Sequence, residues 1–482
     1  MNAANAKLKK PNIIVIMADQ MKATALNLYG NTFCPTPNLE KLARRGVLYE
    51  NAFTPHPLCV PARVALWASQ YPHQSGAKLN QTFMPDNTAH AFKLWKDAGY
   101  HTALIGKNHC FNLESDLDRF EVICELAHKG PEPQSLTRGM AWQSTPEDIK
   151  KAHSVRHAMP CQSEVLSYAV TAFPEEHYST GMITKQTVQY LKEFGDGPFA
   201  LWVSYPDPHT PYEAPARYVT DELIGAVTIP PWESREMPGA PERNRVLRKI
   251  LGVDDENSGE LKNLIAVYHG MIRFIDDGVG GILDALETLG LRENTIVVFC
   301  SDHGDFAGEH GMVNKGGLFY DCLTRVPLIV SAGGHGAAGI VDRSMVNLVD
   351  IVPTLLTLQG LETPPSMRGQ PLPTLTSAKP RELVFSEYGA GKPAFTMNDL
   401  KNCAKTHGIS VLMETLIRRE SEGNRKMVRS VDWKYVHDSE GDLDELYDMK
   451  NDPLELSNRA ADPAYTAVTA KLRAALEEWT RS

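Results

Sequence analysis

Short runs of apolar residues recur along this chain, separated by longer stretches with helical spacing. Six runs predict strands, and several are apolar throughout rather than alternating, which is typical of strands covered on both faces. They lie at residues 12–18, 101–105, 198–205, 295–301, 326–331 and 382–386. Residues 261–289 have the spacing and length of a helix that ends at the Gly290 break. This alternation predicts an α/β sandwich around a large, mostly parallel sheet.

The pattern changes after about residue 376. Residues 427–438 predict an antiparallel hairpin, and residues 465–479 predict an amphipathic terminal helix. We therefore expect a large α/β domain at 1–376 and a small C-terminal domain with an antiparallel sheet and a helix at 377–482.

Two segments of the expected large domain, at 130–163 and 229–256, are rich in proline, glycine and charged residues. Such segments are typical of long loops, and long loops often carry specificity. We expect both insertions to lie over one end of the sheet and to shape a pocket there.

Composition narrows the classes of partner and compartment. The 482 residues carry a formal charge of −10, from 49 basic and 59 acidic side chains, which argues against a nucleic-acid surface. No apolar stretch has the length of a membrane span, and the run at 13–18 is too short for a signal peptide. The eight cysteines show no Cys-x-x-Cys spacing and no disulfide framework, so a cytoplasmic location is expected.

Two predicted strands end in acidic residues that are followed by further polar residues. Asp19-Gln20 follows the first strand, and Asp302-His303 follows the strand at 295–301. Ligands collect at the carboxyl ends of strands in α/β sheets, so Asp19, Gln20, Asp302 and His303 predict a site for one divalent cation. Mostly oxygen ligands suit Ca²⁺, while the imidazole nitrogen favours Mn²⁺. Taken singly, each acid has an alternative interpretation as a helix cap or a turn residue.

Cys59 begins the pentapeptide Cys59-Val60-Pro61-Ala62-Arg63. Pro61 stiffens the turn after the cysteine, and Arg63 places a permanent cation about one helical turn further on. A cysteine in this setting is an unusual structural thiol, and it is a candidate for covalent chemistry beside the predicted metal site.

Further polar residues follow other predicted strands. Lys107 and His109 come after the strand at 101–105, His209 lies between two prolines, and Lys315 lies in a glycine-rich stretch. Beside a divalent cation, lysines neutralise an anionic tetrahedral group and histidines transfer protons. Taken alone, each of these residues has an alternative interpretation as a solvated surface or loop residue.

The chain resembles the type I sulfatases of the alkaline phosphatase superfamily, and the resemblance runs nearly end to end. Its motifs occur in a specific order, at 11–14 with Asp19-Gln20, 36–43, 59–63, Gly106-Lys107-x-His109, Pro208-His209-x-Pro211, Ser301-Asp302-His303-Gly304, Lys315, 325–328 and 445–458. The resemblance implies an alkaline-phosphatase-like catalytic domain at 1–376.

In this family the cysteine of the Cys-x-Pro-x-Arg motif is oxidised to formylglycine by a formylglycine-generating enzyme, and the aldehyde hydrate is the nucleophile. The resemblance therefore implies that Cys59 becomes a ligand and nucleophile beside the predicted cation. The implied roles are that Arg63 and Lys107 stabilise the hydrate and the transferred group, so that Lys107 also binds substrate. His109 accepts a proton when sulfate is released, and His209 and Lys315 bind sulfate and assist the leaving oxygen.

Two pairs of residues differ from the pattern of many sulfatases and leave the substrate open. Many sulfatases have Asp-Asp where this chain has Asp19-Gln20, and Asp-Asn where it has Asp302-His303. The pairs in this chain resemble those of choline sulfatases and phosphonate monoester hydrolases, and Asn80 resembles a substrate-binding asparagine of those subgroups. The Lys107/His109 pair favours a sulfatase.

We expect hydrolysis of a small-molecule sulfate ester. The alternatives are a phosphonate monoester or phosphodiester hydrolase with the same site, and a catalytically inactive relative kept as a binding protein. Neither a nucleic acid nor a membrane is an expected partner, and a homo-oligomer remains open.

Overall fold

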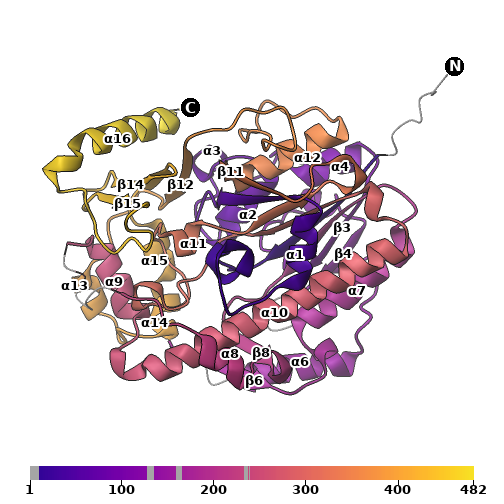
Figure 1. The fold of residues 1–482 in the computed structure, drawn as a ribbon, viewed down its shortest axis with the longest axis horizontal. Coiled ribbons are helices and arrows are strands. Elements are labelled where there is room, and N and C mark those ends of the chain that lie inside the picture. Colours follow the sequence, from indigo (N-terminus) through magenta and orange to yellow (C-terminus); the bar gives the residue numbers. More distant parts are fainter. Residues whose placement is uncertain (1–9, 127–134, 159–164, 233–236, 238, 482) are drawn as a thin grey trace.

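The computed structural model describes residues 10–126, 135–158, 165–232, 237 and 239–481. A nine-stranded sheet runs through its centre (Figure 1). The strands, in order across the sheet, are β11 (Ile340–Asn347), β2 (Val47–Phe53), β10 (Leu328–Ser331), β9 (Thr295–Ser301), β1 (Asn12–Ala18), β7 (Phe199–Tyr205), β3 (His101–Gly106), β4 (Val122–Glu125) and β5 (Thr137–Arg138).

The middle of the sheet is parallel. Strands β9, β1, β7, β3 and β4 run in one direction, and β11 pairs in parallel with β2. Strands β10 and β5 are antiparallel to their neighbours. The prediction of a mostly parallel sheet is confirmed, and the five predicted strand runs between residues 12 and 331 all lie in it.

Alternate residues of β1 enter different cores on the two faces of the sheet. Ile14 and Ile16 belong to one buried cluster with the long helix α10 (Ser258–Thr288) and with α7 (Ser179–Phe194). Val15 belongs to the other cluster, with residues of α2 (Cys59–Ala68), α4 (Ala91–Asp97) and α12 (Ile351–Gln359). Helices on both faces explain why β1 is apolar at nearly every position, since each face must be covered. Figure 1 shows α10 and α7 together along one side of the sheet.

The predicted helix at 261–289 is α10, which begins at Ser258 and ends at Thr288. The other helices of the chain up to residue 376 are α1 (Pro37–Arg44), α2 (Cys59–Ala68), α3 (Pro72–Ser75), α4 (Ala91–Asp97), α5 (Glu114–Leu117), α6 (Pro146–Ala158), α8 (Asp221–Ala226), α9 (Glu242–Leu251), α11 (Asp321–Thr324) and α12 (Ile351–Gln359). A short two-stranded sheet pairs β6 (Tyr168–Thr171) with β8 (Tyr212–Pro215).

A second, antiparallel sheet lies in the C-terminal part of the chain. Its strands, in order, are β12 (Val384–Tyr388), β13 (Arg425–Arg429), β14 (Trp433–Asp438) and β15 (Glu445–Asp448). The predicted hairpin is β13 with β14, and the predicted terminal helix is α16 (Thr466–Arg481). Three shorter helices, α13 (Met397–Lys401), α14 (Ile409–Glu414) and α15 (Leu416–Ser421), lie between β12 and β13.

The fold class is confirmed, with one correction of detail. The strand run at 382–386 is β12, which pairs with β13 in the small sheet. The predicted insertions are more regular than loops. The described part of 130–163 contains β5, which pairs at the edge of the large sheet, and α6, while residues 130–134 and 159–163 lie outside the described residues.

The second insertion, 229–256, contains α9. Its buried Val246 and Leu247 pack in one cluster with Leu400, Val411 and Leu412 of the C-terminal part. The insertion therefore joins the two parts of the chain. The division of the chain at residue 376 stays a prediction.

Candidate active site

The two strand-end acids meet because of the register between their strands. Ala18 at the end of β1 pairs with Ser301 at the end of β9. The next residue of each strand, Asp19 and Asp302, therefore leaves the sheet at the same edge. His303 follows directly, and all three side chains are fully buried.

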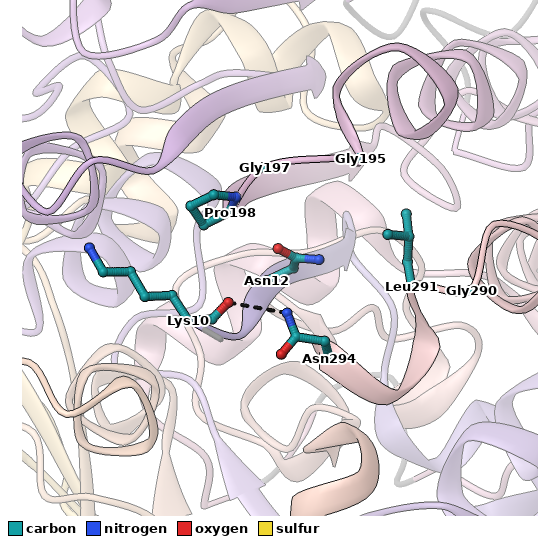
Figure 2. Close-up of a pocket in the computed structure, with 8 residues that line it drawn as sticks. All are labelled: Lys10, Asn12, Gly195, Gly197, Pro198, Gly290, Leu291 and Asn294. Atoms are coloured by element: carbon teal, nitrogen blue, oxygen red, sulfur yellow. Dashed lines mark hydrogen bonds between the residues drawn. The ribbon is translucent and has the colours of Figure 1, made fainter. Parts of the chain in front are cut away.

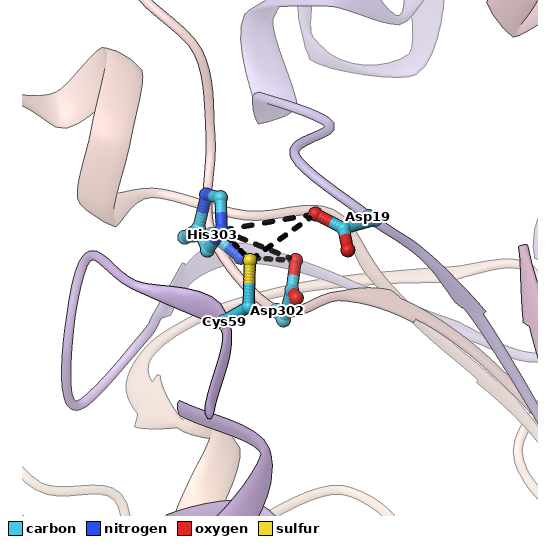
Figure 3. A group of neighbouring side chains, drawn as sticks. All are labelled: Asp19, Cys59, Asp302 and His303. Carbon is cyan, nitrogen blue, oxygen red and sulfur yellow. Dashed lines mark hydrogen bonds and ion pairs between the residues drawn. The ribbon is translucent and has the colours of Figure 1, made fainter. Parts of the chain in front are cut away.

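Helix α2 brings Cys59 to this edge. The helix begins at Cys59, and every residue of it is buried, because it lies between the large sheet and the C-terminal part of the chain. The Cys59 Sγ lies 3.1 Å from His303 Nε2 and 3.6 Å from Asp19 Oδ1. One ligand atom each from Asp19, Cys59, Asp302 and His303 all lie within 4.8 Å of one another (Figure 3). We call these four residues the metal-site group.

Arg63 ties the two acids together one helical turn after Cys59. Its Nε donates to Asp302 Oδ2 and its Nη2 donates to Asp19 Oδ2, both at 2.9 Å. Its Nη1 donates to the backbone oxygens of Lys107 and Asn108 and to Ser204 Oγ. The side chain is fully buried, so the guanidinium acts as a fixed structural cation behind the acids.

Two lysines approach the cysteine from the other side. Lys107 forms an ion pair with Asp19 and lies 3.9 Å from the Cys59 Sγ, and Lys315 Nζ lies 3.2 Å from the same sulfur. Burial and Asp19 oppose ionisation of the thiol, but Lys107, Lys315 and His303 together hold the pKa of Cys59 below its ordinary value. Burial also opposes the charge of Asp19, yet Lys107 and Arg63 lower its pKa well below the usual range. The site therefore favours negative charge on residue 59 and on Asp19.

The donor set fits a hard divalent cation. Gln20 turns its side-chain oxygen toward the site, where Oε1 accepts a hydrogen bond from Lys315 Nζ at 2.7 Å. Its amide nitrogen donates to Asp305 and Asn314, which fixes which end of the amide faces the lysine. His303 Nδ1 lies 2.9 Å from Gly304 O, which leaves Nε2 as the ligand atom. Carboxylate, amide and imidazole donors suit Ca²⁺ or Mn²⁺.

The two predicted proton-transfer residues line the same cavity as Cys59. The cavity has a volume of about 360 Å³, and His109, His209, Lys107 and Lys315 are among its lining residues. Burial is the largest cause that keeps the pKa of each histidine well below its ordinary value, with Lys107 acting on His109 and Lys315 on His209. Both imidazoles are therefore neutral near pH 7 and able to accept a proton.

Asn80 also lines this cavity. Its Oδ1 accepts from the Val60 backbone N–H at 3.2 Å, beside the start of α2. Its backbone N–H and its side-chain amide donate to Glu420 in the C-terminal part of the chain. The amide of Asn80 thus links helix α2 to Glu420.

Every predicted site residue therefore lies in one place, but the sequence did not indicate several supporting residues. Asp305 accepts from Gln20 Nε2 and, at 2.7 Å, from the hydroxyl of Tyr212. Ser204 and Glu420 support Arg63 and Asn80. Asp305 lies three residues after Asp302, so it could have been predicted as a further acid at the end of the same strand. Tyr212, Ser204 and Glu420 belong to no sequence motif that points to the site.

A second cavity lies at the opposite ends of the strands. It has a volume of about 150 Å³ and is lined by residues before β1 and β7 and near β9, among them Lys10, Asn12 and Asn294 (Figure 2). Its eight lining residues include no cysteine, histidine or carboxylate. This cavity therefore lacks the side chains of the candidate site, which lies at the carboxyl ends of the strands, where ligands collect in this class of sheet.

Comparisons with known proteins agree with this geometry. The family model described as Sulfatase matches residues 11–361. The chain is 29% identical to an arylsulfatase from Clostridium perfringens, with 93% of this chain and 90% of the relative covered. It is 28% identical to a choline-sulfatase from Rhizobium meliloti, covering 94% and 83%. The crystal structure of a phosphonate monoester hydrolase from Agrobacterium radiobacter superposes with a TM-score of 0.74 at 25% identity, covering 98% and 96%.

Proposed function

This chain belongs to the sulfatase family and is a sulfuric ester hydrolase, and we propose that it cleaves small sulfate monoesters with a nucleophile derived from Cys59. The observation that carries the proposal is the position of Cys59. Its sulfur contacts two members of the metal-site group, Asp19 and His303, and it also contacts Lys315. A side chain in this position can contact a bound cation and an anionic ester at the same time.

The nucleophile requires oxidation of Cys59 to formylglycine by a formylglycine-generating enzyme. The hydrated aldehyde has two hydroxyl groups on one carbon. One hydroxyl oxygen attacks sulfur and the alcohol leaves; removal of the proton from the other hydroxyl then breaks the C–O bond, which releases sulfate and restores the aldehyde. This route avoids a second attack at sulfur.

Asp19, Gln20, Asp302 and His303 would hold the cation together with the hydrated residue 59. When bound, a divalent ion such as Ca²⁺ or Mn²⁺ lowers the pKa of the attacking hydroxyl and offsets charge on the sulfate oxygens. Burial opposes protonation of His303, but Asp302 and Cys59 together raise the pKa of the imidazole above its ordinary value. A cation therefore competes with a proton for the Nε2 of His303.

The other residues act on charge and protons. Lys107 and Arg63 stabilise the negative charge that develops on residue 59 and on the sulfate. His109, held neutral, accepts the proton when the sulfate is released. Lys315 and His209 bind sulfate oxygens beside the leaving oxygen. Burial and the charge of Lys315 keep His209 neutral, and the negative charge of a bound ester offsets the effect of Lys315. Asn80 borders the bound group.

One observation favours a second candidate, a phosphonate monoester or phosphodiester hydrolase. The fold matches the Agrobacterium phosphonate monoester hydrolase, and the Gln20/His303 pair was the sequence basis of that alternative. Sulfate monoesters and phosphodiesters both carry one negative charge, so the same cations serve either. The presence of Lys107 and His109 in the cavity favours sulfate. An inactive relative would have lost a predicted metal ligand, and all of them are here.

The test is the turnover of an aryl sulfate and of a phenylphosphonate ester by one preparation. The mass of the Cys59 peptide, lower by the difference between CH₂–SH and an aldehyde, measures the converted fraction. We expect sulfate release in proportion to that fraction and none from Cys59→Ala. Faster cleavage of the phosphonate ester than of the sulfate would overturn the proposal.

We also propose a cytoplasmic location. The described cysteines are free thiols, and structural disulfides are typical of oxidising compartments. No helix in the described ranges is long and apolar enough to cross a membrane. Cell fractionation with a specific antibody would test the location, and recovery in a secreted fraction would contradict it.

A further inference from the structure

The cavity that holds the catalytic residues is lined by two chemically different sets of residues. Its lining includes Cys59 and the lysines and histidines described above. It also includes a set of apolar and aromatic residues, which we call the apolar wall; they are Leu58, Tyr388, Ile409, Leu412, Met413 and Leu416. The alcohol part of an ester whose sulfate is bound at Cys59 would share the cavity with the apolar wall.

Most of the wall comes from the C-terminal part of the chain. Ile409, Leu412 and Met413 belong to α14, Leu416 opens α15, and Tyr388 ends β12. These elements are anchored rather than loose.

Leu412 is buried in the cluster with Leu247 of α9, and the Arg425 guanidinium lies 4.7 Å from the centre of the Tyr388 ring. A wall fixed in this way presents a preformed surface to a ligand.

Two polar residues beside the wall form hydrogen bonds with the protein. Arg419 of α15 donates from Nε to Oγ1 of Thr415, which lies between α14 and α15, at 2.8 Å, and from Nη2 to the carbonyl oxygen of Leu412 in α14 at 2.6 Å. Asn80 bonds Val60 and Glu420. Glu420, the carboxylate behind Asn80, accepts two hydrogen bonds from that residue. The wall thus offers a hydroxylated or cationic group little in exchange for its water.

We propose that the natural ester carries a compact apolar alcohol or phenol, and that the apolar wall selects it. This inference rests on the proposed sulfate ester hydrolysis. A cavity of about 360 Å³ has room for a sulfate and one or two rings, since benzene fills a cavity of roughly 150 Å³. We expect esters of sugars and of quaternary ammonium alcohols to bind this cavity poorly, because the wall leaves their hydroxyl groups or charge without partners.

The test compares three primary alkyl sulfates, so that differences in the bond being broken are small. They are cyclohexylmethyl sulfate, glucose 6-sulfate and choline sulfate. We expect kcat/KM for cyclohexylmethyl sulfate to exceed the other two by about 100-fold. Equal values, or a preference for the sugar or the choline ester, would overturn the inference and leave the sulfatase proposal intact. If none of the three releases sulfate from converted enzyme but the aryl sulfate does, this inference fails and the sulfatase proposal stands. If the aryl sulfate is not cleaved either, the sulfatase proposal fails and this inference fails with it.

A matched pair of variants tests the wall itself. Met413 and Ile417 are each 60% exposed, so serine at either position will not disturb the core, but of the two only Met413 lines the cavity. Met413→Ser should lower kcat/KM for cyclohexylmethyl sulfate on the order of tenfold and leave methyl sulfate unchanged. Ile417→Ser should change neither. An equal loss for both esters in Met413→Ser, or the same pattern in Ile417→Ser, would refute the role of the wall.

Discussion

Replacement of Tyr212 by phenylalanine should weaken cation binding although Tyr212 is not a predicted ligand. Its hydroxyl donates to Asp305 Oδ2 at 2.7 Å and accepts from the Asn314 backbone N–H at 3.1 Å. Asp305 in turn accepts from the amide nitrogen of Gln20, and this bond keeps Gln20 Oε1 toward Lys315 and Cys59. Without the Tyr212 hydroxyl, Asp305 holds the amide of Gln20 less firmly, and Gln20 is a predicted metal ligand whose orientation depends on that hydrogen bond.

The size of the effect follows from the groups left without partners. Burial already raises the pKa of Asp305, against the lowering by Tyr212 and Gln20, so loss of Tyr212 raises it further and favours a protonated carboxyl that binds the Gln20 amide poorly. Each buried polar group left unpaired costs about 1–3 kcal/mol, and two groups are affected. We expect a loss of about 2–6 kcal/mol in unfolding free energy and of roughly 10- to 100-fold in cation affinity.

The assay is calorimetric titration of Mn²⁺ into metal-free protein, with urea unfolding of the same samples. Tyr205→Phe is the matched control, because that buried hydroxyl bonds Thr184 Oγ1 at 2.8 Å and has no contact with Gln20 or Asp305. The control should lose stability and keep its affinity for Mn²⁺. Unchanged Mn²⁺ affinity in Tyr212→Phe, or an equal loss in both variants, would refute the assigned role of Gln20.

Three further predictions concern charge. Arg63→Met leaves Asp19 and Asp302 without their shared partner, so urea unfolding should show a loss of about 3–5 kcal/mol; Arg63→Lys should recover only part, and full recovery would contradict the need for a forked cation. Burial raises the pKa of Glu455 to about 7 from 4.5. A raised folded-state pKa adds stability below pH 4.5 that is lost as the pH rises to about 7. In that window the melting temperature of Glu455→Gln should therefore change less with pH than that of the wild type. The same pH dependence in both proteins would refute the shift. Treatment with a chelator should abolish sulfate release and lower the melting temperature, and Mn²⁺ or Ca²⁺ should restore both; undiminished activity after chelation would argue against a metal site.

Asp19, Asp302 and His303 could be predicted from the sequence because the prediction depends on a local signal and a general rule. An acid directly after a buried parallel strand emerges at one known edge of the sheet, whatever its distance along the chain. Asp19 and Asp302 meet for that reason alone. Cys59 required the motif as well, because the sequence does not say which face of the sheet α2 covers.

The sequence could not indicate contacts between residues that are far apart in the chain and belong to no recognisable motif. The apolar residues of α14 look like any amphipathic core segment, and only the folded structure shows that three of them, Ile409, Leu412 and Met413, line the cavity. The same holds for Tyr212 and Asp305, which meet through the geometry of β8 and the loop after β9. The segment 229–256 looked like a loop because proline, glycine and charge surround the ten residues of α9.

Anomalous diffraction from crystals soaked in Mn²⁺ would show whether these side chains bind a cation. We expect a single strong peak in the cavity, about 2.0–2.5 Å from oxygens of Asp19, Gln20 and Asp302, from His303 Nε2 and from the side chain of residue 59, with Lys107 displaced from Asp19. A peak bound elsewhere, or none within reach of Asp19 and Asp302 at saturating Mn²⁺, would contradict this expectation.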